Sequence, residues 1–231
     1  MSAAAWRALN RRIEDCTACP RLVEHCREVA RVKRAAYRDW DYWGKPVPNF
    51  GDPAARVLLV GLAPGAHGSN RTGRMFTGDD SGNWLFRALH RAGFANQPHA
   101  DHRDDGLRLM DCAITAVGHC APPDNKPARD EIAACRHWLA ATVDLLAGVR
   151  VFVALGAIAW RESLREFDRR GWRAGRLPAF GHGEAVDLTG GRWLVGSYHP
   201  SRQNTNTGVL TEAMLDAVFT QVRQVLAASR H

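Results

Sequence analysis

The sequence predicts an α/β protein whose parallel sheet is covered by helices on both faces. Four short apolar runs, typical of buried strands, alternate along the chain with longer stretches of helical pattern. Strands that alternate with helices in this way form parallel sheets between helical layers. With 231 residues, of which 45% are hydrophobic, the chain is long enough for one well-buried domain, which we expect to span residues 1–231.

The expected elements follow from local signals taken in chain order. An irregular, Pro- and Gly-rich stretch at 40–53 separates two N-terminal helices from the first strand. Asp79-Asp80-Ser81 gives a polar start to one helix, Pro127 precedes another, and Gly156 joins a strand to a third. Segment 96–107 is polar and reads as a loop, and a short extra strand is expected near 185–188. The main expected elements are helices 3–15, 21–38, 82–92, 129–147, 157–168 and 210–228, and strands 57–62, 112–117, 150–155 and 193–198.

The charge balance favours a polyanionic partner. Lys and Arg number 31 against 24 Asp and Glu, so the net charge is +7. The arginines are spread through the chain, which fits a basic surface around a cleft better than a disordered basic arm. Many basic proteins bind no nucleic acid, so charge alone is a weak indication. No apolar run has the length of a membrane span or the form of a signal peptide, and no feature favours an oligomer, so we expect a cytoplasmic monomer that does not bind membranes.

The segment from Gly61 to Gly82, GLAPGAHGSNRTGRMFTGDDSG, is where we expect the chemistry. It contains six glycines and directly follows the apolar run VLLV at 57–60. In open α/β sheets, ligands bind in loops at the carboxyl ends of strands. His199 stands in an equivalent place, after the last strand and before a polar loop. An imidazole there could stabilise negative charge that develops on a substrate.

The six cysteines suggest a metal site. Cys16 and Cys19 form a C-x-x-C pair, and Cys120 and Cys135 bracket a Pro-rich loop. Four thiolates in two such pairs can hold either zinc or an iron–sulfur cluster, and spacing does not choose between them. The alternative for the first pair is a redox couple or chance. Cys112 is expected in the core, and Cys26 is a reserve ligand.

Several separate motifs resemble the B-type uracil-DNA glycosylases, the fifth family of the uracil-DNA glycosylase superfamily. The matching segments, in the order and spacing of that family, are GLAPG at 61–65, GRMFTGD at 73–79, CAPPDNKP at 120–127, ALG at 154–156 and SYHPSRQN at 197–204. The resemblance covers nearly the whole chain, from Cys16 to the C-terminal helix. It implies a three-layer α/β/α sandwich with a four-stranded parallel central sheet. It also implies a 4Fe-4S cluster on Cys16, Cys19, Cys120 and Cys135, which we expect to join the N-terminal helices to the rest of the protein.

The resemblance further implies a monofunctional DNA glycosylase of base excision repair. Such an enzyme flips the damaged base into a pocket and breaks its bond to the sugar. In that family the Asp of FTGD orients water or steadies the cationic sugar, which assigns this role to Asp79 and leaves Asp80 for helix capping. His199 would stabilise the departing base, and Asn125 matches a position that assists. The alternatives are an N-cap role for Asp79 and a turn-forming role for Asn125.

The base pocket is expected along the first motif and the end of the second strand. Backbone N–H groups of Leu62, Ala63 and Gly65 could bind the base, and Phe76 could stack on it or act as a lid over the core. Ala63 and Ala116 depart from relatives that carry polar residues there. Loss of an Asn side chain at Ala116 removes hydrogen bonds to the base edge and predicts looser discrimination, so that hypoxanthine and xanthine are accepted besides uracil. The expected pocket comprises Gly61, Leu62, Ala63, Pro64, Gly65, Phe76 and Ala116.

Two loops are expected to contact DNA. The segment after His199 would enter the minor groove, where Arg202 and Gln203 take the place of the aliphatic wedge that related enzymes use. Residues in the glycine-rich loop would line the pocket or bind phosphates, which position the duplex without reading its sequence. The expected DNA contacts are His67, Asn70, Arg71, Ser201, Arg202, Gln203 and Asn204.

Two other functions compete with this one. The first is a non-catalytic nucleic-acid-binding protein held together by zinc or an iron–sulfur cluster, which Ala63 in the first motif keeps open. The second is a nucleotide-binding α/β protein, which is weaker because GLAPGAHG matches neither the Walker pattern nor the dinucleotide pattern.

Overall fold

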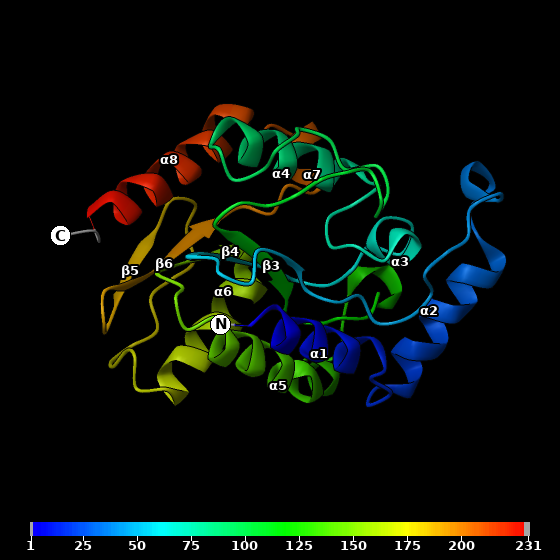
Figure 1. Ribbon diagram of the computed structural model, residues 1–231, viewed down its shortest axis with the longest axis horizontal. Coiled ribbons are helices and arrows are strands. Elements are labelled where there is room, and N and C mark those ends of the chain that lie inside the picture. The colour runs from blue at the N-terminus through cyan, green and yellow to red at the C-terminus, as the bar shows by residue number, and fades with distance from the viewer. Residues whose placement is uncertain (1, 229–231) are drawn as a thin grey trace.

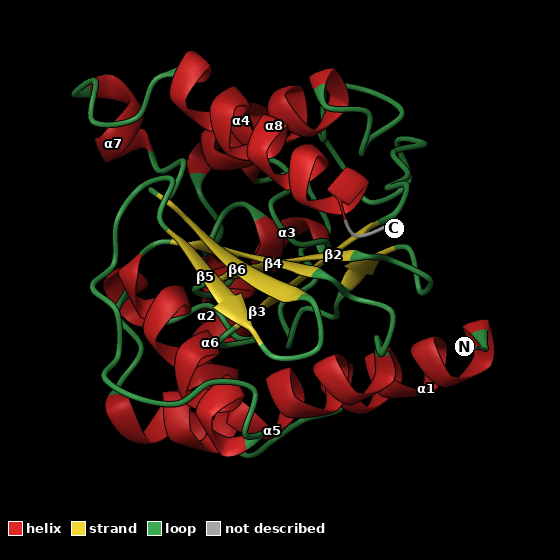
Figure 2. Ribbon diagram, turned by 90° about the vertical axis from the view of Figure 1, so that its left-hand side faces the viewer, coloured by secondary structure: helices red, strands yellow, loops and turns green. Residues whose placement is uncertain are grey.

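A six-stranded sheet lies between two layers of helices in the structure, a computed structural model that describes residues 2–228. Figure 1 shows helices α4 and α8 above the sheet and α1 and α5 below it. Figure 2, turned by a quarter, shows α6 in the same layer as α5. The predicted α/β/α sandwich is confirmed. The helices are α1 (Ala3–Glu14), α2 (Pro20–Val32), α3 (Ser69–Thr72), α4 (Asp80–Arg91), α5 (Arg129–Leu145), α6 (Ala157–Arg169), α7 (Arg202–Asn206) and α8 (Glu212–Ala228).

The prediction of four strands is wrong in number, although the four central strands are parallel as expected. The order across the sheet is β1-β3-β2-β4-β6-β5, with antiparallel edge strands at both ends. β1 has two residues, and β5 joins β6 through a tight turn at Gly190 and Gly191, which both have positive φ. The strands are β1 (Phe50–Gly51), β2 (Val57–Gly61), β3 (Cys112–Ala116), β4 (Val151–Leu155), β5 (Ala185–Leu188) and β6 (Arg192–Ser197).

Each central strand contributes to two hydrophobic cores, which explains why its sequence is apolar throughout. Alternate side chains of a strand point to opposite faces of the sheet. In β2, Val57 and Leu59 pack with α4 and α8, whereas Leu58 and Val60 pack with α5 and α6. A strand buried on both faces therefore shows a continuous apolar run rather than an alternating one.

The N-terminal region differs from the prediction. The expected helix 21–38 ends at Val32, because Lys33 takes a left-handed conformation with φ of 57°, and a short 3-10 helix η1 (Ala35–Tyr37) follows.

Two short helices, α3 and α7, lie inside segments that were expected to be loops. A second 3-10 helix, η2 (Pro123–Asn125), lies in the Pro-rich loop after β3.

Parallel orientation brings the carboxyl ends of β2, β3, β4 and β6 to one edge of the sheet. The glycine-rich loop, the Pro-rich loop, Gly156 and the segment around His199 therefore begin at the same edge, as the sequence predicts. Within residues 2–228, no helix has the length and apolar character needed to cross a membrane.

Candidate active site

Asp79 lies where the glycine-rich loop meets the first turn of α4. Its Oδ1 atom accepts a hydrogen bond from the N–H of Gly82 at 3.0 Å, which makes it the N-cap of the helix. Its Oδ2 atom points at the loop: a Cβ atom on Gly68 would overlap it, and one on Gly65 would lie 3.1 Å away. The two carboxylate oxygens therefore face different partners, one the helix and the other the loop.

The expected division of roles between the two aspartates is wrong for Asp80. The structure makes Asp79 the cap, and Asp80 is an exposed residue of the first turn that forms an ion pair with Arg202 at 2.9 Å. The N-cap role and a catalytic role for Asp79 are compatible, because the cap uses Oδ1 and leaves Oδ2 for other contacts.

Burial raises the pKa of Asp79, and the negative charge of Asp80 acts in the same direction. Hydrogen bonds from the backbone at Gly82 and Ser81 and the positive charge of Arg71 oppose this shift without cancelling it. A carboxylate whose pKa is raised is a better proton acceptor for a water molecule than an ordinary surface aspartate.

Backbone donors lie free at the start of the glycine-rich loop. In the described part of the chain, no hydrogen bond uses the N–H groups of Leu62, Ala63 or Gly65. The Leu62 carbonyl is already occupied, since it accepts a hydrogen bond from the N–H of Gly118 at 2.8 Å. These N–H groups can therefore bind an oxygen atom of a ligand.

Phe76 is held in a strained conformation beside His199. Its φ of 53° lies in the left-handed region, which costs a bulky residue about 1–3 kcal/mol. A Cβ atom on Gly61 would meet the Phe76 ring at 2.9 Å, and one on Gly82 would overlap the Phe76 carbonyl oxygen. The ring centroid lies 5.7 Å from that of His199. Glycine on both sides thus permits the close packing of this aromatic ring.

His199 is a neutral imidazole at physiological pH, because burial lowers its pKa to about 4. Its backbone is fixed by Asn204, whose Nδ2 donates a hydrogen bond to the His199 carbonyl at 2.8 Å. The preceding residue, Tyr198, donates its N–H to Nδ1 of His182 at 3.1 Å. A Cβ atom on Gly156 would lie 3.5 Å from the His199 Cβ atom, so glycine allows β4 to end close to this residue.

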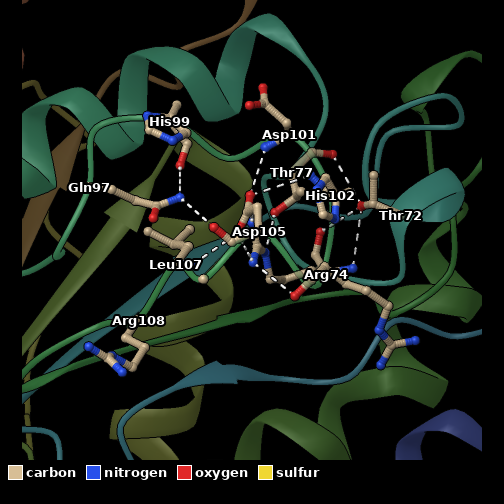
Figure 3. Close-up of polar contacts among 12 residues, drawn as sticks. Thr72, Arg74, Thr77, Gln97, His99, Asp101, His102, Asp105, Leu107 and Arg108 are labelled. Carbon is tan, nitrogen blue, oxygen red and sulfur yellow. Dashed lines mark hydrogen bonds and ion pairs between the residues drawn. The ribbon is translucent and has the colours of Figure 1, made fainter.

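A buried ion pair attaches the glycine-rich loop to segment 96–109 (Figure 3). The guanidinium of Arg74 forms two hydrogen bonds with Asp105, at 2.8 and 2.7 Å, and both side chains are nearly inaccessible. Asp105 also accepts hydrogen bonds from the N–H groups of Asp101 and Leu107, so its segment folds around the carboxylate. Arg74 lies five residues before Asp79, and this ion pair therefore fixes the part of the loop that carries Phe76 and Asp79.

Hydroxyl groups extend this connection within the loop. Thr77 accepts a hydrogen bond from Nε of Arg74 at 2.8 Å, and Thr72 lies within hydrogen-bonding distance of the Arg74 and Thr77 carbonyls, as Figure 3 also shows. The N–H of Gly78 donates to the Ala100 carbonyl at 2.8 Å. Thr72, Arg74, Thr77 and Gly78 therefore each form a hydrogen bond that holds this part of the loop in place.

Two of the predicted DNA contacts are buried. Asn70 has no exposed surface and donates to the carbonyls of Cys26 and Ala66. Arg71 donates to the carbonyls of His67 and Gly78, and its guanidinium lies 3.9 Å from the ring centroids of both Tyr37 and Trp40. A role for these two side chains in binding phosphate does not fit this burial; they hold the loop together instead.

His67 is partly exposed, and one ring nitrogen lies 3.0 Å from the hydroxyl of Tyr42. Burial lowers the pKa of His67, and the positive charges of Arg34 and Arg71 lower it further, which disfavours the charged form of the ring. It lies two residues before α3 and is partly exposed, which leaves a contact with a ligand open.

The segment after His199 forms the short helix α7 rather than an open loop. Ser201 caps it by accepting a hydrogen bond from the N–H of Asn204. Arg202 and Gln203 are exposed, whereas Asn204 points back to the His199 carbonyl. The structure thus leaves the first two available to a partner and gives Asn204 a positioning role.

Asn125 lies exposed in η2, with a φ of 56°. Among the described residues, its side chain forms no hydrogen bond with Asp79 or His199. A turn-forming Asn explains this geometry, because Asn tolerates left-handed conformations better than other non-glycine residues. Ala116 is buried at the end of β3, where it pairs with Gly61, and its methyl group offers no hydrogen bond to a ligand.

The four predicted cysteine ligands line one pocket, although they come from three separate parts of the chain. Cys16 and Cys19 flank the turn between α1 and α2, Cys120 follows β3, and Cys135 lies on α5. All four are free thiols. Across residues 2–228, no three His, Cys, Asp or Glu side chains converge closely enough to hold a single metal ion.

Two other polar atoms of residues that line this pocket are buried and lack a partner in the described structure: Nε1 of Trp138 and Nε2 of His119. Buried polar atoms normally have a hydrogen-bond partner. Cys26 does not line the pocket; its sulfur accepts a hydrogen bond from the N–H of Ala121 at 3.2 Å, as expected of a packing residue. Cys112 is fully buried in β3, as predicted.

Sequence reasoning missed the residues that position the site. Asp105 and His182 lie outside the matching motifs, and Arg74 lies within GRMFTGD without a role of its own there; their partners are 16 to 31 residues away in the sequence.

Comparison with known proteins identifies a family and close relatives. Residues 48–223 match the family model of the uracil DNA glycosylase superfamily. The chain is 50% identical to a type-5 uracil-DNA glycosylase of Mycobacterium leprae over 218 residues, which is 94% of each chain. It is 51% identical to one of Thermus thermophilus over 91% of this chain and 93% of that one. A type-4 uracil-DNA glycosylase of Thermotoga maritima is 28% identical over 84% of this chain and 80% of its own length.

The Arg74–Asp105 pair predicts a measurable change in stability. Burial opposes ionisation of Asp105, but hydrogen bonds from Arg74 and from the Leu107 N–H outweigh it and lower the pKa to about 2. Asp105→Asn should reduce the free energy of unfolding at pH 7 by about 3 kcal/mol, because it leaves the Arg74 charge buried without a partner.

Because the folded pKa of Asp105 is depressed, the ion pair stabilises the protein above the ordinary pKa of Asp and loses this effect as the pH falls toward 2. The free energies of unfolding of the native protein and of Asp105→Asn, measured with urea, should therefore become equal as the pH falls from about 4 to 2. Asp104→Asn, a change at the exposed neighbour, is the control and should leave stability within about 0.5 kcal/mol. If Asp105→Asn and Asp104→Asn lowered the free energy of unfolding equally, the stabilising role of the ion pair would be contradicted.

Proposed function

Since the chain belongs to the uracil-DNA glycosylase superfamily, we propose that this enzyme removes uracil from DNA by hydrolysing the bond between the base and the deoxyribose. The observation that carries the proposal is the joint placement of Asp79 and His199 at the carboxyl edge of the sheet, within a chain half identical to type-5 uracil-DNA glycosylases. The product would be an abasic site for base excision repair.

The reaction begins when the damaged nucleotide leaves the duplex and its base enters the pocket. The bond between the sugar carbon C1′ and the base nitrogen breaks, and its electron pair leaves with the base. The sugar becomes oxocarbenium-like, and the oxygen of a water molecule bonds to C1′ while a proton leaves that water. The site therefore has to stabilise a negative base and a positive sugar, and to accept a proton.

Asp79 performs two of these tasks. Its Oδ1 is engaged by helix α4, so Oδ2 is the atom that holds the water and takes its proton, and the carboxylate charge steadies the cationic sugar. A raised pKa makes it a better acceptor for that proton.

His199 and the loop backbone stabilise the departing base. The neutral imidazole donates an N–H to the developing negative charge, and the free N–H groups of Leu62, Ala63 and Gly65 add further donors. Phe76, whose ring lies between Gly61 and His199, stacks on the base with its accessible part.

Broad base specificity follows from what the pocket lacks. Ala116 offers a methyl group at the position where stricter relatives carry an Asn that reads the edge of uracil, and Ala63 replaces a polar residue of the first motif. A site discriminates strongly only when a wrong substrate leaves its buried polar groups without partners. We therefore extend the substrates to hypoxanthine and xanthine.

Ser201, Arg202 and Gln203 are the residues that enter the minor groove, and the enzyme acts as a monomer.

The four pocket cysteines would hold a structural 4Fe-4S cluster. Thiolates are the usual donors for such clusters, and a pocket whose cysteines do not meet at one point suits a cluster, in which each cysteine binds a different iron. The unpartnered Nε1 of Trp138 could donate to a sulfur atom there. The group would connect α1 and α2 to the loop after β3 and to α5, and it takes no part in hydrolysis.

Three variants test the catalytic assignment through base release from a duplex with one uracil. Asp79→Asn keeps an N-cap side chain but removes the charge, so the rate should fall about a hundredfold or more with little loss of stability. His199→Ala should cause a similar fall. Asp80→Ala, the adjacent control, should retain most of the activity.

If Asp79→Asn and Asp80→Ala are equally active, Asp79 serves only as a cap. If the native protein binds DNA yet releases no uracil, hypoxanthine or xanthine, the non-catalytic binding function replaces the enzyme. Hypoxanthine and xanthine duplexes run in parallel test the broad specificity separately.

The pKa values predict the pH dependence of the rate. Because burial lowers the pKa of His199 to about 4, this residue stays neutral and should cause no change in rate between about pH 6 and 8. The rate should fall only on the acidic side, where the raised pKa of Asp79 allows protonation. Single-turnover rates measured across this range check both points. A fall between pH 6 and 7 that disappears in His199→Gln would contradict a neutral His199.

The cluster proposal is tested by chemical analysis of the purified protein. About four iron and four sulfide per chain are expected, with broad visible absorbance. Cys120→Ala should lose most of the iron, whereas Cys112→Ala, a change at a core cysteine outside the pocket, should keep it. Protein that contains zinc and no sulfide would contradict the proposal.

A further inference from the structure

A second concentration of positive charge lies in the groove between α5 and α6, and none of its lining residues belongs to the glycine-rich loop or to the segment around His199. Four arginines and a single acidic residue line it, so the groove carries a formal charge of +3, out of +7 for the whole chain. The lining residues are Arg129, Ile132, Arg136, Arg161, Glu162 and Arg165. We call this feature the arginine groove.

Glu162 fixes the positions of three of these arginines. Its side chain is 1% exposed; Oε2 lies 2.8 Å from Arg136, and Oε1 lies 2.7 Å from Arg165 and 3.5 Å from Arg161. One carboxylate neutralises one charge, and the three arginine side chains remain 45–49% exposed. Each guanidinium has five N–H donors, so donors remain for a ligand after the contact with Glu162.

Arg129 adds a fourth cation with no counter-ion. No ion pair or hydrogen bond within residues 2–228 involves its side chain. Other arginines of the chain, such as Arg21, Arg56 and Arg74, each form a bidentate pair with one acidic residue. The arginine groove therefore holds an excess of positive charge that internal pairing does not explain.

The groove starts at the edge of the sheet that carries the active site. Arg129 is the first residue of α5, directly after the loop that follows β3, and α6 begins immediately after Gly156, which lies against His199. Arg136 is seven residues further along, about 10 Å down the helix axis. Figure 2 shows α5 and α6 on the same side of the sheet. The cations thus form a row that leads away from the catalytic edge.

We propose that the arginine groove is a second DNA site, which binds backbone phosphates of the duplex on one side of the damaged nucleotide. This inference rests on the proposed glycosylase function. Guanidinium groups match phosphate oxygens in a bidentate geometry, and cations held in place by a buried carboxylate lose little freedom on binding. The lining contains no aromatic side chain on which a base could stack, so phosphates rather than bases are its ligand.

The test compares two double variants that remove equal charge. Arg161→Gln/Arg165→Gln changes two groove arginines spaced four apart on α6, and Arg136 stays to pair with Glu162. Arg87→Gln/Arg91→Gln is the matched control: these residues are also four apart, share Glu212, and lie toward the opposite end of α4 from Asp79. Binding is measured with a long duplex and with a short duplex that covers only the lesion, each carrying a stable abasic-site analogue.

The groove variant should bind the long duplex about tenfold more weakly at 50 mM salt, and its plot of log affinity against log salt should be shallower by about 2. Its affinity for the short duplex and its single-turnover rate of uracil release at saturating DNA should not change. Arg161→Lys/Arg165→Lys should restore most of the salt dependence, because it keeps the charge. Equal slopes for the two double variants, or an equal loss on the short duplex, would overturn the proposal.

Inorganic tripolyphosphate distinguishes DNA from a free anion as the occupant. If the native protein binds tripolyphosphate through the groove arginines more tightly than the long duplex, the groove serves a free polyanion and the DNA proposal fails. If the native protein neither binds DNA nor releases a base from it, the glycosylase function itself fails. If Arg161→Gln/Arg165→Gln releases uracil normally and its salt slope equals that of the native protein, only the groove proposal fails.

Discussion

The carboxylate of Asp79 connects the glycine-rich loop to helix α4, and the active site depends on this contact. One oxygen accepts the N–H of Gly82, and the other lies against Gly65 and Gly68, so closely at Gly68 that a Cβ atom there would overlap it. The cap fixes the start of α4, and the glycines let the loop approach the carboxylate. The same side chain that begins the helix is thereby placed, partly desolvated, where a water molecule can be activated.

The strained conformation around Phe76 is maintained by contacts outside the loop. The Arg74–Asp105 ion pair and the Gly78–Ala100 hydrogen bond attach the loop to segment 96–109 on one side. On the other side, Asn204 and His182 fix the backbone beside His199. Hydrolysis of a glycosidic bond requires groups of opposite character within one pocket, and these contacts hold them there before a substrate binds. The positively charged groove between α5 and α6 begins at the same edge of the sheet, where the proposed second DNA site would continue from the active site.

Periodicity and turn chemistry were sufficient to predict the central layer. The continuous apolar runs at β2, β3 and β4 identified buried parallel strands, and Pro127 and Gly156 marked the starts of α5 and α6 within a residue or two. Of the two edge strands, β5 lies at 185–188 where a short extra strand was expected, whereas β1 has only two residues and no clear pattern. The helix that was expected to continue to residue 38 stops at Val32 because Lys33 adopts a positive φ, a conformation that Lys rarely takes and that its sequence does not announce.

By itself the sequence determined the fold class, the edge of the sheet at which the site lies, the resemblance to a family and the cysteines that line one pocket. These follow from residue order, because parallel strands bring their carboxyl ends together whatever the detail of the packing. Only the tertiary structure decided that Asp79 rather than Asp80 caps α4, that Asn70 and Arg71 are buried, and that Arg74 pairs with Asp105. Burial and pairing arise between segments far apart in the chain, and the free energy of such contacts depends on distances that residue order does not encode.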